Sequence, residues 1–269
     1  MAQTGTTNPD ALVLERFEAS VLHLTLNRPS QFNALSDGML EGLQAALDGA
    51  AARPEVRVVV IGGAGKAFCA GHDLKEMQSK PSEGYYQDLF DACSRLMLTI
   101  QCLPQPVIAR VHGVAAAAGC QLVAMCDLAV AADDARFAVP GIKVGLFCGT
   151  PSVALARNVG RKTAFEMLVT GDFIDAATAE RKGLVNRVVP VGDLDGAVAA
   201  LAADIVAKPR AAISAGKQLF YRQIETGIEE AYQQAGRTMV CNLQDEDTKE
   251  GIAAFIERRP PRWSLPARD

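Results

Sequence analysis

The run VRVVVIGG, residues 56–63, limits the possible fold more than any other part of the sequence. Its β-branched residues followed by two glycines are typical of a strand that is buried on both faces. It follows another strand-like segment, VLHLTLNRP at 21–29, and the segment 36–52, where a Ser-Asp pair and helical apolar spacing predict a helix. This strand–helix–strand order predicts βαβ connectivity and an α/β fold.

The rest of the chain extends this pattern. We expect a first strand in ALVLERF, a helix over 87–103, strands in PQPVIARVHG and CDLAVAAD, and a flexible loop over 78–86. From Leu194 onward the sequence is helical in character with few β-branched residues. We therefore predict two parts, an α/β core at 1–195 and a helical C-terminal region at 196–269.

Composition excludes several classes of protein. The net charge of −4 over 269 residues provides no basic surface for nucleic acid. The longest apolar run is interrupted by Gln121 and Asp127, so it predicts a buried helix and not a membrane span. Seven scattered cysteines without a Cys-x-x-Cys pair, and three separated histidines, predict neither disulfides nor a metal site. Reduced, mostly buried thiols and a polar N-terminus lead us to expect a cytoplasmic protein.

Two segments combine small residues with a predicted helix start. They are AAAAGCQLVAMCD at 115–127 and Ala70-Gly71-His72-Asp73. Backbone N–H groups at such points lack intrahelical acceptors, and two of them converging on one oxygen would form an oxyanion hole. Close helix packing explains the small residues equally well. A phosphate loop is excluded, because Ala67 follows Lys66 where a Walker motif needs Ser or Thr.

Four longer segments resemble the crotonase family, also called the enoyl-CoA hydratase/isomerase superfamily. They are NRPSQFNAL, KAFCAGHDLKEM, VHGVAAAAGCQLVAMCDLAVAADDARFAVPGIKVGL and LVTGDFIDAATAERKGLVNRVV. The resemblance covers roughly residues 12 to 260 and is closest to a divergent hydratase-domain-containing branch. It implies a ββα spiral core, a C-terminal helical region used in trimer assembly, and an acyl-CoA thioester as substrate. No separate cofactor is implied, since coenzyme A is part of that substrate.

The resemblance also assigns the site. The two oxyanion amides fall on His72 and on Ala118, where the family usually has glycine, and they stabilise a thioester enolate. The methyl group of the alanine narrows the approach but leaves the N–H in place. The loop after Arg28 and the segment 70–74 are expected to pass along the CoA, with the backbone near Ala70 meeting the adenine. The implied CoA contacts are Arg28, Ala70, Asp73 and Leu74.

Hydratases of this family carry two glutamates that hold and activate water. By resemblance these belong at the positions of Gln121 and Gly141. Glutamine can orient water but cannot take its proton, and general acid–base help is worth roughly 10²–10⁴ in rate. We therefore expect efficient hydration to be absent. Replacing both residues with glutamate is expected to raise hydration if the scaffold is otherwise intact.

Three side chains remain as candidates for chemistry. The His72 imidazole could act as acid or base, or could be a histidine without a chemical role. Cys148 stands where the naphthoate synthase branch has an aspartate, and is either a nucleophile or a buried inert thiol. Gln121 either orients water or packs at the helix start.

Three functions are therefore open at this stage. The first is an enzyme acting on enoyl- or acyl-CoA with a relocated acid/base. The second is thioester hydrolysis or a lyase reaction in the same oxyanion hole. The third is a catalytically silent acyl-CoA binder. The resemblance implies a homotrimer or a dimer of trimers in each case.

Overall fold

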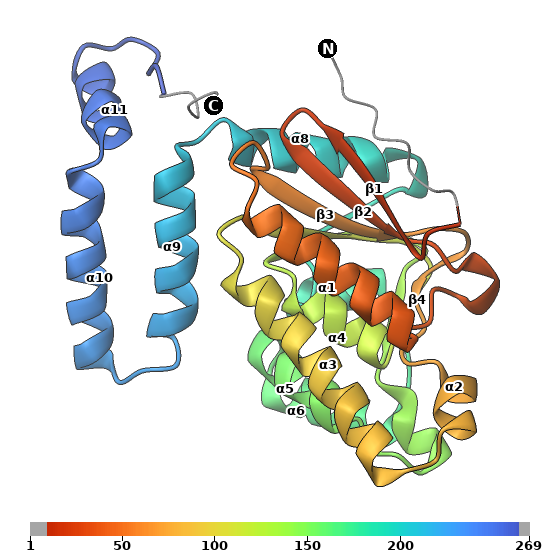
Figure 1. Ribbon diagram of the computed structural model, residues 1–269. Helices are drawn as coiled ribbons and strands as arrows, with labels where there is room; N and C mark the ends of the chain where they lie inside the picture. Colours follow the sequence, from red (N-terminus) through yellow and green to blue (C-terminus); the bar gives the residue numbers. More distant parts are fainter. Residues whose placement is uncertain (1–9, 264–269) are drawn as a thin grey trace.

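A six-stranded sheet forms the centre of the computed structural model, which describes residues 10–263 (Figure 1). The strand order is β1-β2-β3-β5-β7-β10, and every neighbouring pair is parallel except the β1–β2 hairpin. The strands are β1 (Val13–Glu18), β2 (Val21–Leu26), β3 (Val58–Gly63), β5 (Val107–Val111), β7 (Leu128–Ala132) and β10 (Arg187–Val189). The predicted βαβ unit is confirmed, because β2 and β3 pair in parallel across helix α1 (Asp37–Ala51).

Alternate side chains of β3 explain why its sequence is apolar throughout. Val59 and Ile61 pack into the main core with α1 and α3 (Glu83–Cys102), while Val58 and Val60 pack against α8 (Leu194–Val206). The sheet is thus covered on both faces, as a parallel sheet must be. Figure 1 shows α1 and α3 on one side of the sheet and α8 on the other.

A second, four-stranded sheet was not predicted from the sequence. Its order is β4-β6-β8-β9, with bounds Ala67–Cys69, Val114–Ala116, Arg136–Ala138 and Ile174–Asp175. Strand β6 takes up the first alanines of 115–127, so the helix predicted there, α4 (Ala118–Met125), begins later than expected. The backbone groups of Val114–Ala116 pair with β4 and β8, which overrides the helical preference of alanine.

The predicted loop over 78–86 is mostly helical. Helix α2 (Leu74–Ser79) includes its first two residues, and only residues 80–82 are non-helical. The Ser82 hydroxyl accepts from the Tyr85 N–H and so begins α3. The remaining helices of the core lie between β8 and β10. They are α5 (Gly149–Asn158), α6 (Arg161–Thr170) and α7 (Ala176–Lys182).

The C-terminal region is helical, as predicted. Helices α9 (Arg210–Gln223), α10 (Ile228–Leu243) and α11 (Glu246–Ile256) follow α8 and extend to one side of the body (Figure 1). The predicted boundary near residue 195 falls at the start of α8 and stays a prediction. Among residues 10–263, no helix combines the length and the apolar character needed to cross a membrane.

A buried ion pair fixes α9 to the body. The Lys217 ammonium donates to the Asp127 carboxylate at 2.7 Å and to two main-chain carbonyls of the core. The Tyr221 hydroxyl donates to the other Asp127 oxygen at 2.8 Å. Because the Lys217 side chain is only 6% exposed, this pair satisfies polar groups that would otherwise be buried without partners.

Candidate active site

A cavity of about 340 Å³ lies between α2, the start of α4 and the segment 140–151. Its lining includes Ala70, His72, Leu74, Ala118 and Cys148, so five residues predicted for the site are brought together. Arg28, Asp73 and Gln121 are not part of this lining. The cavity has no carboxylate, ammonium or guanidinium group among its lining residues, and its walls are mostly apolar.

The two segments predicted to form an oxyanion hole are in contact. A Cβ atom built on Gly71 would lie 2.8 Å from the Cβ of Ala117 and 3.3 Å from the amide nitrogen of Ala118. Only glycine therefore fits at position 71, where φ is also +98°. The next residue, His72, lines the same cavity as Ala118.

The amides of His72 and Ala118 are free to donate. Their neighbours are engaged, because the Ala70 N–H donates to Phe32, the Asp73 N–H to Leu35 and the Ala117 N–H to Ala138. Within residues 10–263, the amides of His72 and Ala118 themselves donate to no carbonyl. Two unpaired donors thus lie on adjacent segments at one cavity, which is the arrangement an oxyanion hole requires.

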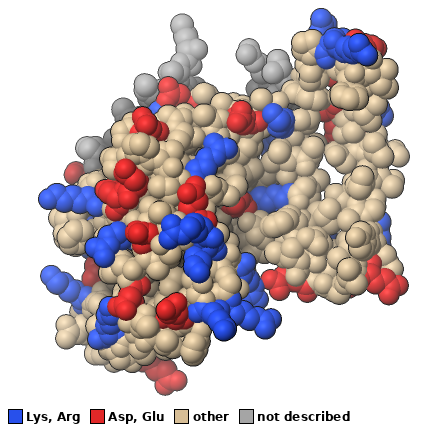
Figure 2. Space-filling model, turned by 180° about the vertical axis from the view of Figure 1, so that it is seen from behind, with Lys and Arg blue, Asp and Glu red and all other residues tan. Residues whose placement is uncertain are grey.

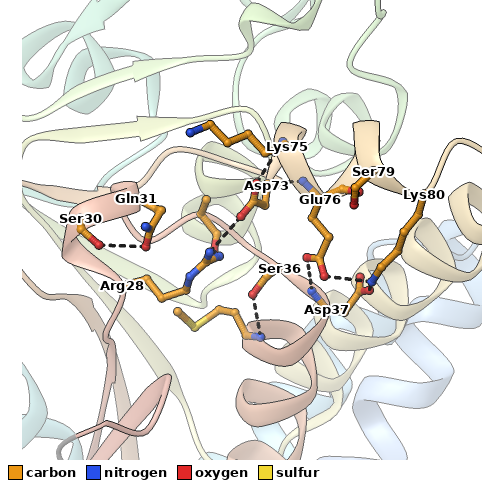
Figure 3. Close-up of polar contacts among 12 residues, drawn as sticks. Arg28, Ser30, Gln31, Ser36, Asp37, Asp73, Lys75, Glu76, Ser79 and Lys80 are labelled. Carbon is orange, nitrogen blue, oxygen red and sulfur yellow. Dashed lines mark hydrogen bonds and ion pairs between the residues drawn. The ribbon is translucent and has the colours of Figure 1, made fainter.

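An ion pair holds the loop after β2 against the start of α2. Figure 3 shows the Arg28 guanidinium reaching Asp73, with an Nη2–Oδ2 distance of 2.9 Å. Arg28 also donates to the Ala34 carbonyl, and Asp73 caps α2 by accepting from two amides of its first turn. The side chains of both residues are therefore occupied with each other and with the backbone, and they position the 70–74 segment.

Asn33 supports the same loop from inside. It is fully buried, with a left-handed φ of 55°. Its amide Nδ2 donates to the carbonyls of Ala64, Ala67 and Phe68, and its Oδ1 accepts from the Arg28 N–H at 2.9 Å. The side chain thereby joins the turn after β2 to the β3–β4 connection.

Charged residues anchor the far end of α2. The Lys80 ammonium donates to Asp37 at 2.7 Å and to Glu76 at 3.0 Å (Figure 3). The Tyr85 hydroxyl donates to the other Asp37 oxygen. Helix α2 is therefore fixed at both ends, while Leu74 and Met77 contribute to the cavity wall between them.

The His72 imidazole packs edge-to-face on Phe90, with ring centroids 5.7 Å apart. Both ring nitrogens are buried and have no hydrogen-bond partner. Burial lowers the pKa of His72, and the nearby Leu35 carbonyl and Asp37 carboxylate oppose the shift only in part. The ring is therefore neutral at pH 7, and neither of its nitrogens is exposed to solvent.

Gly141 and Cys148 fill the place where the family's second glutamate was expected. The Cys148 Sγ accepts from the Gly141 N–H at 3.3 Å. A Cβ built on Gly141 would lie 2.4 Å from the Leu146 carbonyl oxygen and 2.7 Å from the Cys148 Sγ. Burial raises the pKa of Cys148, so the residue is a thiol and not a thiolate at neutral pH.

Gln121 lies one turn into α4. Its main-chain N–H donates to the Ala117 carbonyl at 3.0 Å. Its side chain is buried, and the side-chain oxygen Oε1 has no hydrogen-bond partner. The residue shares a helix face with Ala118, three positions earlier.

Several features of the site carry no clear sequence pattern. The apolar wall residues Met77 and Phe90 come from amphipathic helices, where they look like ordinary core positions. The spacing of Met77, three residues after Leu74, places both on one helix face and could have indicated the wall. Nothing in the sequence indicates the unusual backbone of Ala117.

Comparison with known proteins decides the family. The family profile for enoyl-CoA hydratase/isomerase matches residues 16–265. The chain belongs to the enoyl-CoA hydratase/isomerase family. The fold of this family member confirms the assignment. A crystal structure of enoyl-CoA hydratase from Mycobacterium smegmatis superposes on it with a TM-score of 0.93. The two sequences are 61% identical, and the match covers 94% of this chain and 98% of that one.

A second group of relatives carries a more specific name. The human enoyl-CoA hydratase domain-containing protein 3, mitochondrial, is 45% identical over 91% of this chain and 80% of its own length. The crystal structure of that human protein has a TM-score of 0.92 at 42% identity, over 94% of this family member and the whole of the human chain. The Xenopus laevis protein of the same name is 44% identical over 92% of this chain and 84% of its own. The expected cytoplasmic location of this family member stays a prediction.

Proposed function

We propose that this protein binds acyl-CoA thioesters and holds the thioester carbonyl oxygen with the amides of His72 and Ala118. The supporting observation is the pair of unpaired N–H groups on adjacent segments at one apolar cavity. Each such donor is worth about 3 kcal/mol to an oxygen that gains negative charge. The site would therefore favour an enolate over the thioester from which it forms.

The same cavity supplies little acid–base chemistry. Its lining residues include no carboxylate, and the His72 ring nitrogens are shielded from the cavity. Hydration of an enoyl thioester needs a group that takes a proton from water and one that returns a proton to carbon. We therefore expect crotonyl-CoA hydration slower by orders of magnitude than that of a relative with two glutamates.

The second candidate function is binding without turnover. The absence of any carboxylate from the cavity lining supports it directly. Thioester hydrolysis by Cys148 is less favoured, because the raised pKa of its thiol leaves little of the nucleophilic thiolate. Turnover assays with enoyl- and acyl-CoAs distinguish these functions. A silent binder converts neither substrate, a hydrolase releases free CoA, and an enzyme with a relocated acid/base converts the acyl group.

The proposed CoA path uses backbone more than side chains. Ala70 and Leu74 lie on the cavity lining, whereas Arg28 and Asp73 pair with each other. We assign the last two a positioning role, in which their ion pair holds the 70–74 segment against the ligand. The basic residues Lys66 and Lys75, both exposed, flank this segment and suit the phosphates of CoA.

Assembly as a homotrimer or a dimer of trimers is proposed for the C-terminal helices. Figure 2 shows them projecting from the body, with charged side chains gathered near their two ends and mostly uncharged surface between. Large apolar side chains on these helices are exposed, namely Phe220, Ile228, Tyr232, Met239, Phe255 and Ile256. Such exposed apolar surface is typical of a protein–protein interface. Light scattering should therefore give a molecular mass in solution equal to three or six chains.

Removal of one donor tests the thioester site. Proline lacks an N–H and is tolerated at the first position of a helix, which Ala118 occupies in α4. We expect Ala118→Pro to weaken butyryl-CoA binding by about tenfold, the effect of one lost hydrogen bond. Arg161→Pro, at the first position of α6 and exposed, is the matched control and should bind normally. Equal affinities of the two folded variants would refute the proposed hole.

A further inference from the structure

The backbone of Ala117 adopts a conformation suited to glycine. Its φ of 49° and ψ of −119° are those of the first central residue of a type II′ turn. An alanine in this region is strained, and such strain persists where the surrounding structure enforces it. The Ala117 N–H donates to Ala138 at 2.9 Å, and its carbonyl accepts from Gln121 at 3.0 Å. A glycine could make both bonds without the strain, so the fold itself does not require the methyl group.

The methyl group stands beside both proposed donors. Ala117 directly precedes the Ala118 amide, and its Cβ faces Gly71, the residue before His72. Ala117 lines the cavity and is partly exposed. Its neighbours Ala116 and Ala118 are buried, with only 6% and 1% of their surface exposed. In the proposed complex the carbonyl oxygen lies between the two amides. The α-carbon is bonded to the carbonyl carbon, so it too would lie close to this methyl group.

We propose that Ala117 is a specificity-determining residue whose methyl group restricts the site to thioesters with an unbranched α-carbon. This inference rests on the proposed thioester function and adds the class of acyl group. A substituent on the α-carbon would compete with the methyl group for the same space, while bulk farther along the chain would enter the apolar part of the cavity. One methyl group in a closely fitting pocket is worth roughly 10- to 200-fold in discrimination.

Two isomeric thioesters provide the test. Butyryl-CoA and isobutyryl-CoA contain the same atoms and differ in branching at the α-carbon, and neither can be hydrated. Their dissociation constants are measured by calorimetry for the wild type, Ala117→Gly and Val144→Ala. The last variant removes methyl groups from another wall of the same cavity. We expect wild type and Val144→Ala to prefer butyryl-CoA by at least about tenfold, and Ala117→Gly to reduce the ratio below about threefold.

The possible outcomes distinguish a failure of the specificity role of Ala117 from a failure of the proposed thioester binding. If wild type binds neither thioester, the proposed function fails and the inference fails with it. If wild type binds both equally, or if Ala117→Gly leaves the ratio unchanged, the specificity role alone is overturned. Thermal melting provides an independent check on the backbone, since relief of strain should raise the Tm of Ala117→Gly by about 2–4 °C.

Discussion

The Gly141 amide donates a hydrogen bond to the Cys148 Sγ at 3.3 Å, and these two residues leave no room for a side chain at position 141. The Leu146 carbonyl oxygen would lie 2.4 Å from the first side-chain atom. A glycine that replaces a glutamate in an otherwise unchanged loop would leave open space. In the folded chain that space is filled, so the segment 140–151 differs in shape as well as in chemistry from what a glutamate would need.

The double variant Gln121→Glu, Gly141→Glu should therefore gain no hydratase activity. The expected gain assumed an otherwise intact scaffold, and the contacts of Gly141 contradict that assumption. Forcing a side chain into this site should cost about 1–3 kcal/mol in the free energy of unfolding. Crotonyl-CoA hydration and urea denaturation measure both effects, with Gln121→Glu alone as the control. A large rise in hydration without loss of stability would show that the loop adapts.

Stability should fall as the pH drops below about 6.5, because His72 is buried in its neutral form. Burial lowers its pKa from an ordinary value of 6.5. Unfolded chains then bind a proton that the folded chain does not, so the free energy of unfolding rises with pH by up to about 1.4 kcal/mol per unit. This contribution is complete above pH 6.5 and is lost as the pH falls from there toward the folded pKa.

His72→Phe should flatten that pH dependence. Urea denaturation between pH 5 and pH 7.5 measures it, and the comparison is made in a His23→Gln background, because burial also lowers the pKa of His23. An unchanged slope after His72→Phe would mean that the imidazole takes up protons in the folded protein as readily as in the unfolded one.

Asn33→Ala should destabilise the protein by about 3 kcal/mol. The substitution leaves three carbonyl groups and the Arg28 N–H without their buried partner. Each buried polar group left without a hydrogen bond lowers the free energy of unfolding by about 1–3 kcal/mol. Denaturant unfolding gives the loss. Gln31→Ala, an exposed residue of the same turn, is the control and should change stability by less than about 0.5 kcal/mol.

Lys217→Ala should cost about 3–5 kcal/mol, because it leaves the Asp127 carboxylate buried without its counter-charge. The double variant Lys217→Ala, Asp127→Asn should recover part of this loss. A coupling energy near zero in the double-mutant cycle would contradict the role assigned to the pair. Since Lys217 lies on α9, proteolysis of the C-terminal helices should also become faster in the single variant.

The central sheet and its helices follow from local patterns in the sequence. Apolar periodicity locates α1 and α3, and the continuous β-branched run locates β3, because both depend on residues close together in the chain. Strands β4, β6 and β8 escape such analysis, since each has only three residues and no usable period. Their pairing across 20 or more residues decides that Val114–Ala116 is extended.

The site was predictable where it depends on residue type and order. The small residues before His72 and Ala118 pointed to two segments, and these segments lie in contact in the structure. Their role in an oxyanion hole stays a prediction. The state of individual side chains depends on three-dimensional packing instead. The pairing of Arg28 with Asp73, the shielding of the His72 nitrogens and the filled space at Gly141 all arise from neighbours distant in the chain.

The two proposed donors follow β4 and β6, which are adjacent strands of the smaller sheet. Their meeting point therefore exists only while that sheet is intact, and partly opened molecules would lose affinity for a thioester. Mass action then links occupancy to folding: ligand at 100 times its Kd would add about 2.7 kcal/mol to the free energy of unfolding. Under the proposed function, the supply of acyl-CoA would therefore contribute to the fraction of the protein that stays folded.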